Sequence, residues 1–221
     1  MWILPTRSRP ESCKRFIQAW NDTKSSTPVY VRLDNNDPKL SELIKLEWPS
    51  TFKIETGERE GVAKATNDFF LNHSNEPWYG FLADDFLPKT EEWDIKLVEA
   101  AGSRFISYPN DMAYRQDLPT MPCVGGDLVR AMGFFGFPKA YHYYVDTVYQ
   151  YIGTHLNNIK RLDNVVVEHL HYSYNKSAMD IVYQESNEKF KNDKKVWKNW
   201  IDREGLELLH KLTIEGFKIN E

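Results

Sequence analysis

Apolar and polar positions alternate in short blocks over the first 75 residues. Apolar runs typical of buried strands lie at 1–4 and 29–33, with a weaker run at 51–55. Apolar residues recur at helical spacing within 13–20, 40–46 and 61–71. The order is therefore strand, helix, strand, helix, strand, helix, and this alternation predicts a parallel sheet with helices on its faces.

The alternation continues less regularly in the rest of the chain. We expect strands at 78–83, 104–108 and 164–172, and helices at 93–101, at 141–156 and from 180 onward. The segment 109–138 is rich in Pro, Gly and Met and contains a short helix near 127–132. The whole pattern predicts an α/β fold that ends in a charged helical segment.

Composition excludes several classes of protein. The chain has 221 residues, 14% aromatic residues and a formal net charge of −4, which is typical of a folded domain with a sizeable core. Two cysteines exclude a disulfide framework and a cysteine-rich zinc site. No apolar run approaches the roughly 20 residues of a membrane helix, and the first residues do not resemble a secretory signal. We therefore expect a cytoplasmic protein without membrane insertion, and its weak acidity gives no overall attraction to nucleic acid.

Ligands of parallel α/β sheets bind beyond the carboxyl ends of the strands. The polar loops 6–10 and 34–38 follow two of the expected strands and are the first candidates for a binding site. Asp84 and Asp85 end the strand at 78–83, and two adjacent carboxylates resist burial unless a positive group compensates them. Mg²⁺ or Mn²⁺ together with a diphosphate would do so, whereas an Asx turn at the strand end is the alternative.

The segment Glu168-His169-Leu170-His171 is a second candidate. On a strand, His169 and His171 point to one face and Glu168 to the other. Two imidazoles on one face can hold a metal or a phosphate, although ordinary surface histidines give the same pattern. If a metal binds, Asp85 is the expected further ligand.

A third candidate is Asp146, which follows the aromatic segment 141–144 near an expected helix start. A carboxylate in this position can act as a general base toward a hydroxyl group. It can equally cap the helix.

Together these segments resemble GT-A glycosyltransferases, which use nucleotide sugars. The resemblance is carried by four segments and covers roughly residues 2–185: Ile3-Leu4-Pro5-Thr6-Arg7-Ser8-Arg9-Pro10, Val31-Arg32-Leu33-Asp34-Asn35-Asn36, Gly61-Val62-Ala63-Lys64-Ala65-Thr66-Asn67 and Phe81-Leu82-Ala83-Asp84-Asp85-Phe86-Leu87-Pro88. It implies a mixed, mainly parallel sheet flanked by helices, with a catalytic domain at 1–175 and a C-terminal helical extension at 176–221 packed on it.

The resemblance also implies roles for individual residues. It assigns binding of a UDP- or GDP-sugar donor to Pro5, Thr6, Arg7, Arg9, Asp34, Arg59, Asn67 and Asp84. It assigns Mn²⁺ or Mg²⁺ to Asp85 with His169 and His171, and the role of catalytic base to Asp146, which would invert the anomeric carbon. Ala83 stands where the family's Asp-x-Asp motif has its first acidic residue, so Asp84 is the candidate to replace that contact.

Small phage-encoded glycosyltransferases are similar over a longer co-linear series. The series comprises Trp93-Asp94, His142 to Asp146, Glu168 to His171, and Asp180 to Tyr183. A phage origin would imply the host cytoplasm as location and a 5-hydroxymethylated pyrimidine in DNA as acceptor; a glycan or a protein is the alternative acceptor.

Basic residues interleaved with aromatic ones could contact DNA. They are Arg115, Arg130, Lys189, Lys191, Lys194, Lys195 and Lys198, with Trp197 and Trp200. The simpler interpretation is a solvated lysine face on a helix whose tryptophans pack inward. A Mg-dependent nucleotidyltransferase and a nonenzymatic virion protein are the competing functions, and the sequence does not predict the oligomeric state.

Overall fold

The computed structural model describes residues 1–112 and 117–219. Within them, eight strands form one sheet in the order β3-β2-β1-β4-β7-β6-β8-β5. The strands are β1 (Trp2–Thr6), β2 (Val29–Asp34), β3 (Phe52–Gly57), β4 (Trp78–Phe81), β5 (Phe86–Pro88), β6 (Ile106–Asn110), β7 (Cys123–Gly125) and β8 (Ile159–His169). β1 pairs in parallel with β2 and β4, β2 with β3, and β6 with β8, whereas β7 and β5 are antiparallel to their neighbours. The predicted α/β class with a mixed, mainly parallel sheet is confirmed.

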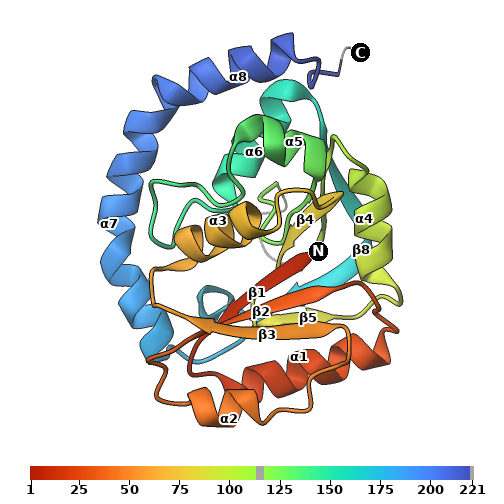
Figure 1. The fold of residues 1–221 in the computed structure, drawn as a ribbon, viewed down its shortest axis with the longest axis vertical. Coiled ribbons are helices and arrows are strands. Elements are labelled where there is room, and N and C mark those ends of the chain that lie inside the picture. Colours follow the sequence, from red (N-terminus) through yellow and green to blue (C-terminus); the bar gives the residue numbers. More distant parts are fainter. Residues whose placement is uncertain (113–116, 220–221) are drawn as a thin grey trace.

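Helices cover both faces of the sheet (Figure 1). They are α1 (Pro10–Asp22), α2 (Leu40–Ile44), α3 (Val62–Asn72), α4 (Trp93–Ala101), α5 (Gly126–Met132), α6 (Thr147–Leu156), α7 (Ile181–Ile201) and α8 (Glu204–Ile214), with a short 3₁₀ turn at Tyr172–Tyr174. The long helix α7, coloured blue in Figure 1, runs along one side of the molecule and leads into α8. Within the described residues, no helix combines the length and apolar character that crossing a membrane requires.

The first strand shows why the core has two layers. Successive side chains of a strand point to opposite faces, so Trp2 and Leu4 enter the core beneath α1 and α4 while Ile3 enters the other layer. All three are fully buried. A central strand covered on both faces is apolar throughout, which explains the unbroken apolar run at 1–4.

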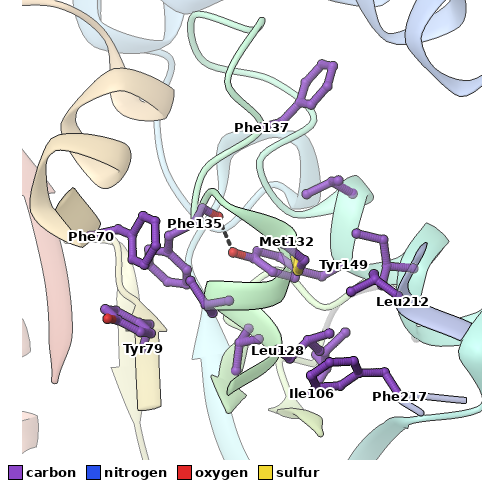
Figure 2. Close-up of a cluster of buried hydrophobic side chains, with 14 of the residues drawn as sticks. Phe70, Tyr79, Ile106, Leu128, Met132, Phe135, Phe137, Tyr149, Leu212 and Phe217 are labelled. Carbon is purple, nitrogen blue, oxygen red and sulfur yellow. Dashed lines mark hydrogen bonds between the residues drawn. The ribbon is translucent and has the colours of Figure 1, made fainter. Parts of the chain in front are cut away.

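The second layer is closed by the C-terminal segment (Figure 2). The hydroxyl of Tyr149 on α6 donates a hydrogen bond to the carbonyl of Phe135. Leu212 of α8 and Phe217 after it pack into the same cluster. Phe137 packs edge-on against both tryptophans of α7, Trp197 and Trp200, which stack on each other. The extension at 176–221 therefore contributes buried side chains to the core.

Two elements differ most from their predicted bounds, and two short strands are not predicted at all. The strands β5 and β7 are three residues each. β5 is a strand through its pairing with β8, and β7 through its pairing with β4 and β6, so neither has a periodic pattern of its own. The helix expected at 141–156 begins at Thr147, because residues 141–146 form a loop. The strand expected at 164–172 spans 159–169 instead, since its polar first half pairs in parallel with β6.

Candidate active site

An open cleft of about 430 Å³ lies at the edge of the sheet where β1 and β2 end. Eleven of the twelve candidate residues line it: Pro5, Thr6, Arg7, Arg9, Asp34, Arg59, Asp84, Asp85, Asp146, His169 and His171. The carboxyl ends of parallel strands meet at one edge, which is why segments far apart in the sequence converge here. The 141–146 loop and the first turns of α7 complete the walls.

The loop after β1 is held in a defined shape. Ser8 has a positive φ of 57°. Its backbone nitrogen and hydroxyl donate to the carboxylate of Asp37, over 2.7 and 2.8 Å. These hydrogen bonds offset the cost of a left-handed conformation at a residue other than glycine. Arg7 and Arg9 on either side are thereby directed to the cleft.

Asp34 at the end of β2 lies between two arginines. Its Oδ2 atom is 3.1 Å from Arg7 Nη1 and 3.8 Å from Arg59 Nε. Burial raises the pKa of Asp34, and the charge of Arg7 acts in the opposite direction. Arg59 also pairs with Glu185 of α7 at 2.5 Å. This end of the cleft thus offers one carboxylate and two guanidinium groups to a ligand.

Asp84 is bound from two sides. Thr6 Oγ1 donates to it at 2.5 Å, and Arg9 Nη1 lies 3.1 Å away. Arg9 also forms two hydrogen bonds with Asp180, at 2.7 and 2.9 Å, and lies over the ring of Tyr183. Burial nevertheless raises the pKa of Asp84. Asp84 is therefore a fixed part of the cleft floor rather than a free ligand.

Asp85 next to it has an unsatisfied oxygen. Tyr183 donates to Oδ2 at 2.7 Å, while Oδ1 is buried without a hydrogen-bond partner and lies 3.5 Å from His169 Nε2. Burial opposes ionisation of Asp85, but the contacts with His169, Tyr183 and Arg9 outweigh it and hold its pKa below the usual range. The result is an ionised carboxylate whose free lone pairs point toward an imidazole.

Asp85, His169 and His171 offer a carboxylate and two imidazoles, which are groups that can bind a divalent cation. The ring centroids of His169 and His171 are 5.2 Å apart, and burial lowers the pKa of His171 to about 4, which keeps it a neutral, potential ligand. His171 lies beyond the end of β8, but its ring still lies beside that of His169. The described residues contain no group of three or more His, Cys, Asp or Glu side chains arranged around one point, so phosphate or water would complete the coordination.

Glu168 points away from this group, as its place on the strand predicts. It forms ion pairs with Lys89 and Lys176, both at 3.0 Å. Glu168 does not line the cleft.

Asp146 lies where the 141–146 loop meets α6. It caps α6, with Oδ1 accepting from the nitrogen of Thr147 at 2.6 Å, and it also lines the cleft. Burial raises its pKa, and the hydrogen bonds from Thr147 act in the opposite direction. A carboxylate with a raised pKa next to a cleft suits a general base.

Asn67 and Asp94, two residues that the resemblance includes, have structural roles instead. Asn67 lies outside the cleft, where its amide donates to the carbonyls of Ala63 and Gly136 and accepts from the nitrogen of Phe135, so we correct its assignment to donor binding. Asp94 is fully buried on α4 and likewise lies outside the cleft. Its hydrogen bonds fix the loop before β2.

Most of the basic residues considered for DNA binding lie on the solvent-exposed face of α7. The five lysines of α7 are exposed, while Trp197 and Trp200 are buried and unavailable for stacking on bases. Arg130 donates to backbone carbonyls at Ser74 and Glu76, and Arg115 lies outside the described residues.

The start of α7 is part of the site, although the sequence patterns assign it no role there. Asp180, Tyr183 and Glu185 contact Arg9, Asp85 and Arg59 respectively. The spacing of Asp180 and Tyr183, one turn apart at a helix start, was the available signal, since Asp180 also caps α7 through the nitrogen of Tyr183.

Comparisons with known proteins identify the fold. A scan against protein-family models finds no match, and a search of curated proteins finds no relative. Among solved structures, the mannosyltransferase PcManGT from Pyrobaculum calidifontis in complex with GDP-Man and Mn²⁺ has a TM-score of 0.59 and 12% identity, covering 77% of this chain and 56% of its own. A mycobacterial protein has a TM-score of 0.55 and 11% identity, covering 82% and 68%. The chain thus spans little more than half of the mannosyltransferase, and its fold is similar to that of a glycosyltransferase.

Proposed function

We propose that this protein is a metal-dependent glycosyltransferase that moves a sugar from a nucleoside diphosphate sugar to an acceptor hydroxyl. One observation carries the proposal: the Asp85–His169 pair, with its unsatisfied buried oxygen, shares a cleft with Asp34 and its two arginines. A nucleoside diphosphate needs a metal site for its phosphates and hydrogen-bonding groups for its nucleoside. The likeness in fold to a protein that binds GDP-Man and Mn²⁺ supports the proposal.

The nucleoside is assigned to the end of the cleft at β1 and β2. Asp34 accepts hydrogen bonds from the base or the ribose, and the loop at 6–9 lies beside it. Arg7 and Arg59 hold Asp34 in position and offer further donors to phosphate oxygens. UDP- and GDP-sugars are the donors to test first.

Asp85 with His169 or His171 would hold Mn²⁺ or Mg²⁺. When bound, such a cation supplies Lewis-acid stabilisation of the negative charge on the departing diphosphate. The protein's own contribution is to keep Asp85 ionised, through Tyr183 and His169, and to keep His171 neutral.

Asp146 takes the proton from the acceptor hydroxyl as it attacks the anomeric carbon. Its raised pKa suits this role, which accelerates reactions by about 10²–10⁴-fold. A base on the acceptor side implies inversion at that carbon.

The acceptor classes are a 5-hydroxymethylated pyrimidine in DNA and a hydroxyl of a glycan or protein. A nucleotidyltransferase is disfavoured, because the loop at 6–10 lacks the glycines that would let a backbone wrap a triphosphate. Incubation with hydroxymethylated DNA, plain DNA and a glycan panel, followed by mass spectrometry of the products, separates the acceptor classes.

The roles are tested with a panel of nucleotide sugars and Mn²⁺, following diphosphate release. Asp85→Ala should abolish transfer and weaken donor binding. Asp146→Asn should leave donor binding intact and lower turnover about 10²–10⁴-fold. Asp163→Asn, at a side chain 80% exposed outside the cleft, is the matched control and should behave as wild type. Equal losses of donor affinity in the first two variants would contradict the assigned roles.

A further inference from the structure

A buried carboxylate on α7 binds the backbone of the 141–146 loop. Asp193 has no solvent exposure. Its Oδ1 accepts from the nitrogen of Tyr141 at 3.0 Å, and its Oδ2 accepts from the nitrogens of His142 and Tyr143, both at 2.9 Å. Three backbone N–H groups in a row thus converge on one side chain, and within the described part of the chain no Lys or Arg forms an ion pair with it.

The loop needs such support because its backbone is strained. Tyr144 has a positive φ of 69°, which is costly for an aromatic residue. Its ring stacks on Trp197 of α7 at 5.4 Å between centroids, with 14° between the planes. On the opposite side, the carbonyl of Tyr141 accepts from the nitrogen of Ala63 in α3. The loop is therefore held by contacts with both α3 and α7.

The strained segment leads directly to Asp146, three residues after the last amide that Asp193 binds. The walls of the cleft include the whole loop. A carboxylate that fixes this backbone also fixes where Asp146 lies relative to Asp85 and His169. A misplacement of about 1 Å can cost about 10²-fold in rate.

We propose that Asp193 is a positioning residue for sugar transfer: through three backbone amides it holds the 141–146 loop so that Asp146 stays in place at the acceptor side of the cleft. This inference rests on the proposed function. It makes α7 a working part of the acceptor side of the site, in addition to its contacts with Arg9 and Arg59 on the donor side.

The chain contains a matched control for this proposal. Asp94 is equally buried and also accepts three hydrogen bonds, from the nitrogens of Ser26 and Thr27 and the hydroxyl of Thr27, at 2.7–2.9 Å. It fixes a loop outside the cleft. Both Asp94→Asn and Asp193→Asn remove a buried charge, and only the second touches the catalytic loop. All three hydrogen bonds of Asp94 reach Oδ2, so its Asn variant can keep them and controls for the loss of the charge alone.

The experiment compares Asp193→Asn, Asp94→Asn and Asp146→Asn. In Asp193→Asn an amide NH₂ must face at least one backbone N–H, so the loop shifts. We expect kcat to fall about 10²-fold with the donor KM unchanged, whereas Asp94→Asn keeps kcat. In the Asp146→Asn background, Asp193→Asn should have little further effect, because both changes remove the same contribution.

A structural readout accompanies the kinetics. Hydrogen exchange of the amides of Tyr141, His142 and Tyr143 should be faster in Asp193→Asn than in Asp94→Asn. Unchanged exchange there, or a kcat equal to that of Asp94→Asn, overturns the inference while leaving the proposed function intact. A wild-type protein that releases no diphosphate from any donor overturns the proposed function instead. If Asp193→Asn does not fold, Asp193→Ser, which retains one acceptor, replaces it.

Discussion

Arg9 offers a direct test of the electrostatics of the cleft floor. Arg9→Met keeps much of the side-chain volume over Tyr183 but removes the guanidinium that pairs with Asp84 at 3.1 Å. The side chains of Arg9 and Asp84 are only 12% and 5% exposed. The variant therefore leaves a buried carboxylate with Thr6 as its remaining partner.

The expected loss of stability follows from the burial of the Arg9–Asp84 pair. Removing one partner of a buried ion pair costs about 3–5 kcal/mol. The second pair of Arg9, with Asp180, adds about 0–1 kcal/mol at most, because Asp180 is 39% exposed. With a denaturant dependence of about 2 kcal/mol per molar urea, the total loss of about 3–6 kcal/mol should move the midpoint down by about 1.5–3 M.

The sign of the pH dependence provides a second check. Without Arg9, burial raises the folded-state pKa of Asp84 further above its unfolded value, so the ionised form is penalised only in the folded protein. The variant should lose stability as the pH rises above about 4, and its deficit should be larger at pH 8 than at pH 5. Adding Asp84→Asn should restore most of the loss and remove this dependence.

Urea unfolding followed by circular dichroism measures all three proteins. A loss below about 1 kcal/mol in Arg9→Met, or a loss that Asp84→Asn does not restore, would refute the reasoning.

Two further predictions concern the core and the proposed base. Phe137→Ala removes a fully buried ring that packs against Trp197 and Trp200, so the free energy of unfolding should fall by about 3–5 kcal/mol in chemical denaturation; a change under about 1 kcal/mol would mean that α7 does not depend on this contact. Because burial raises the pKa of Asp146, kcat/KM should fall on acidification at a pH above the ordinary aspartate value of about 3.9, as the base becomes protonated. This fall of kcat/KM at low pH should be absent from the residual activity of Asp146→Asn. If it persists in that variant, another group causes it.

The sequence predicts the elements whose patterns are local. The β-α alternation up to residue 75 is confirmed, because buried parallel strands and amphipathic helices each carry their own period. β7 was missed because Cys123–Gly125 is a strand only through its place between β4 and β6. The start of α6 was placed too early because amides that would have extended the helix bind Asp193, a contact over about fifty residues of sequence.

Chain topology also decides which residues of the candidate site can be predicted from the sequence. Residues at the ends of parallel strands, such as Asp34 and Asp85, could be expected to converge because topology alone brings them together. Asn67 lies on a helix, where the rotation of about 100° from one residue to the next decides whether a side chain faces the cleft or the neighbouring loop. Asp193 sits among lysines in a segment that looks solvated, and only the packing of α7 reveals its buried role.

The dependence of the cleft on α7 has a consequence for biosynthesis. At about 5–20 residues per second, the segment from 176 to 221 follows the sheet by a few seconds of translation. Until it emerges, the nascent chain lacks Asp193, Tyr183 and the tryptophans that cover the second core layer. Until α7 and α8 dock, the growing chain would therefore expose apolar side chains of this core layer to solvent.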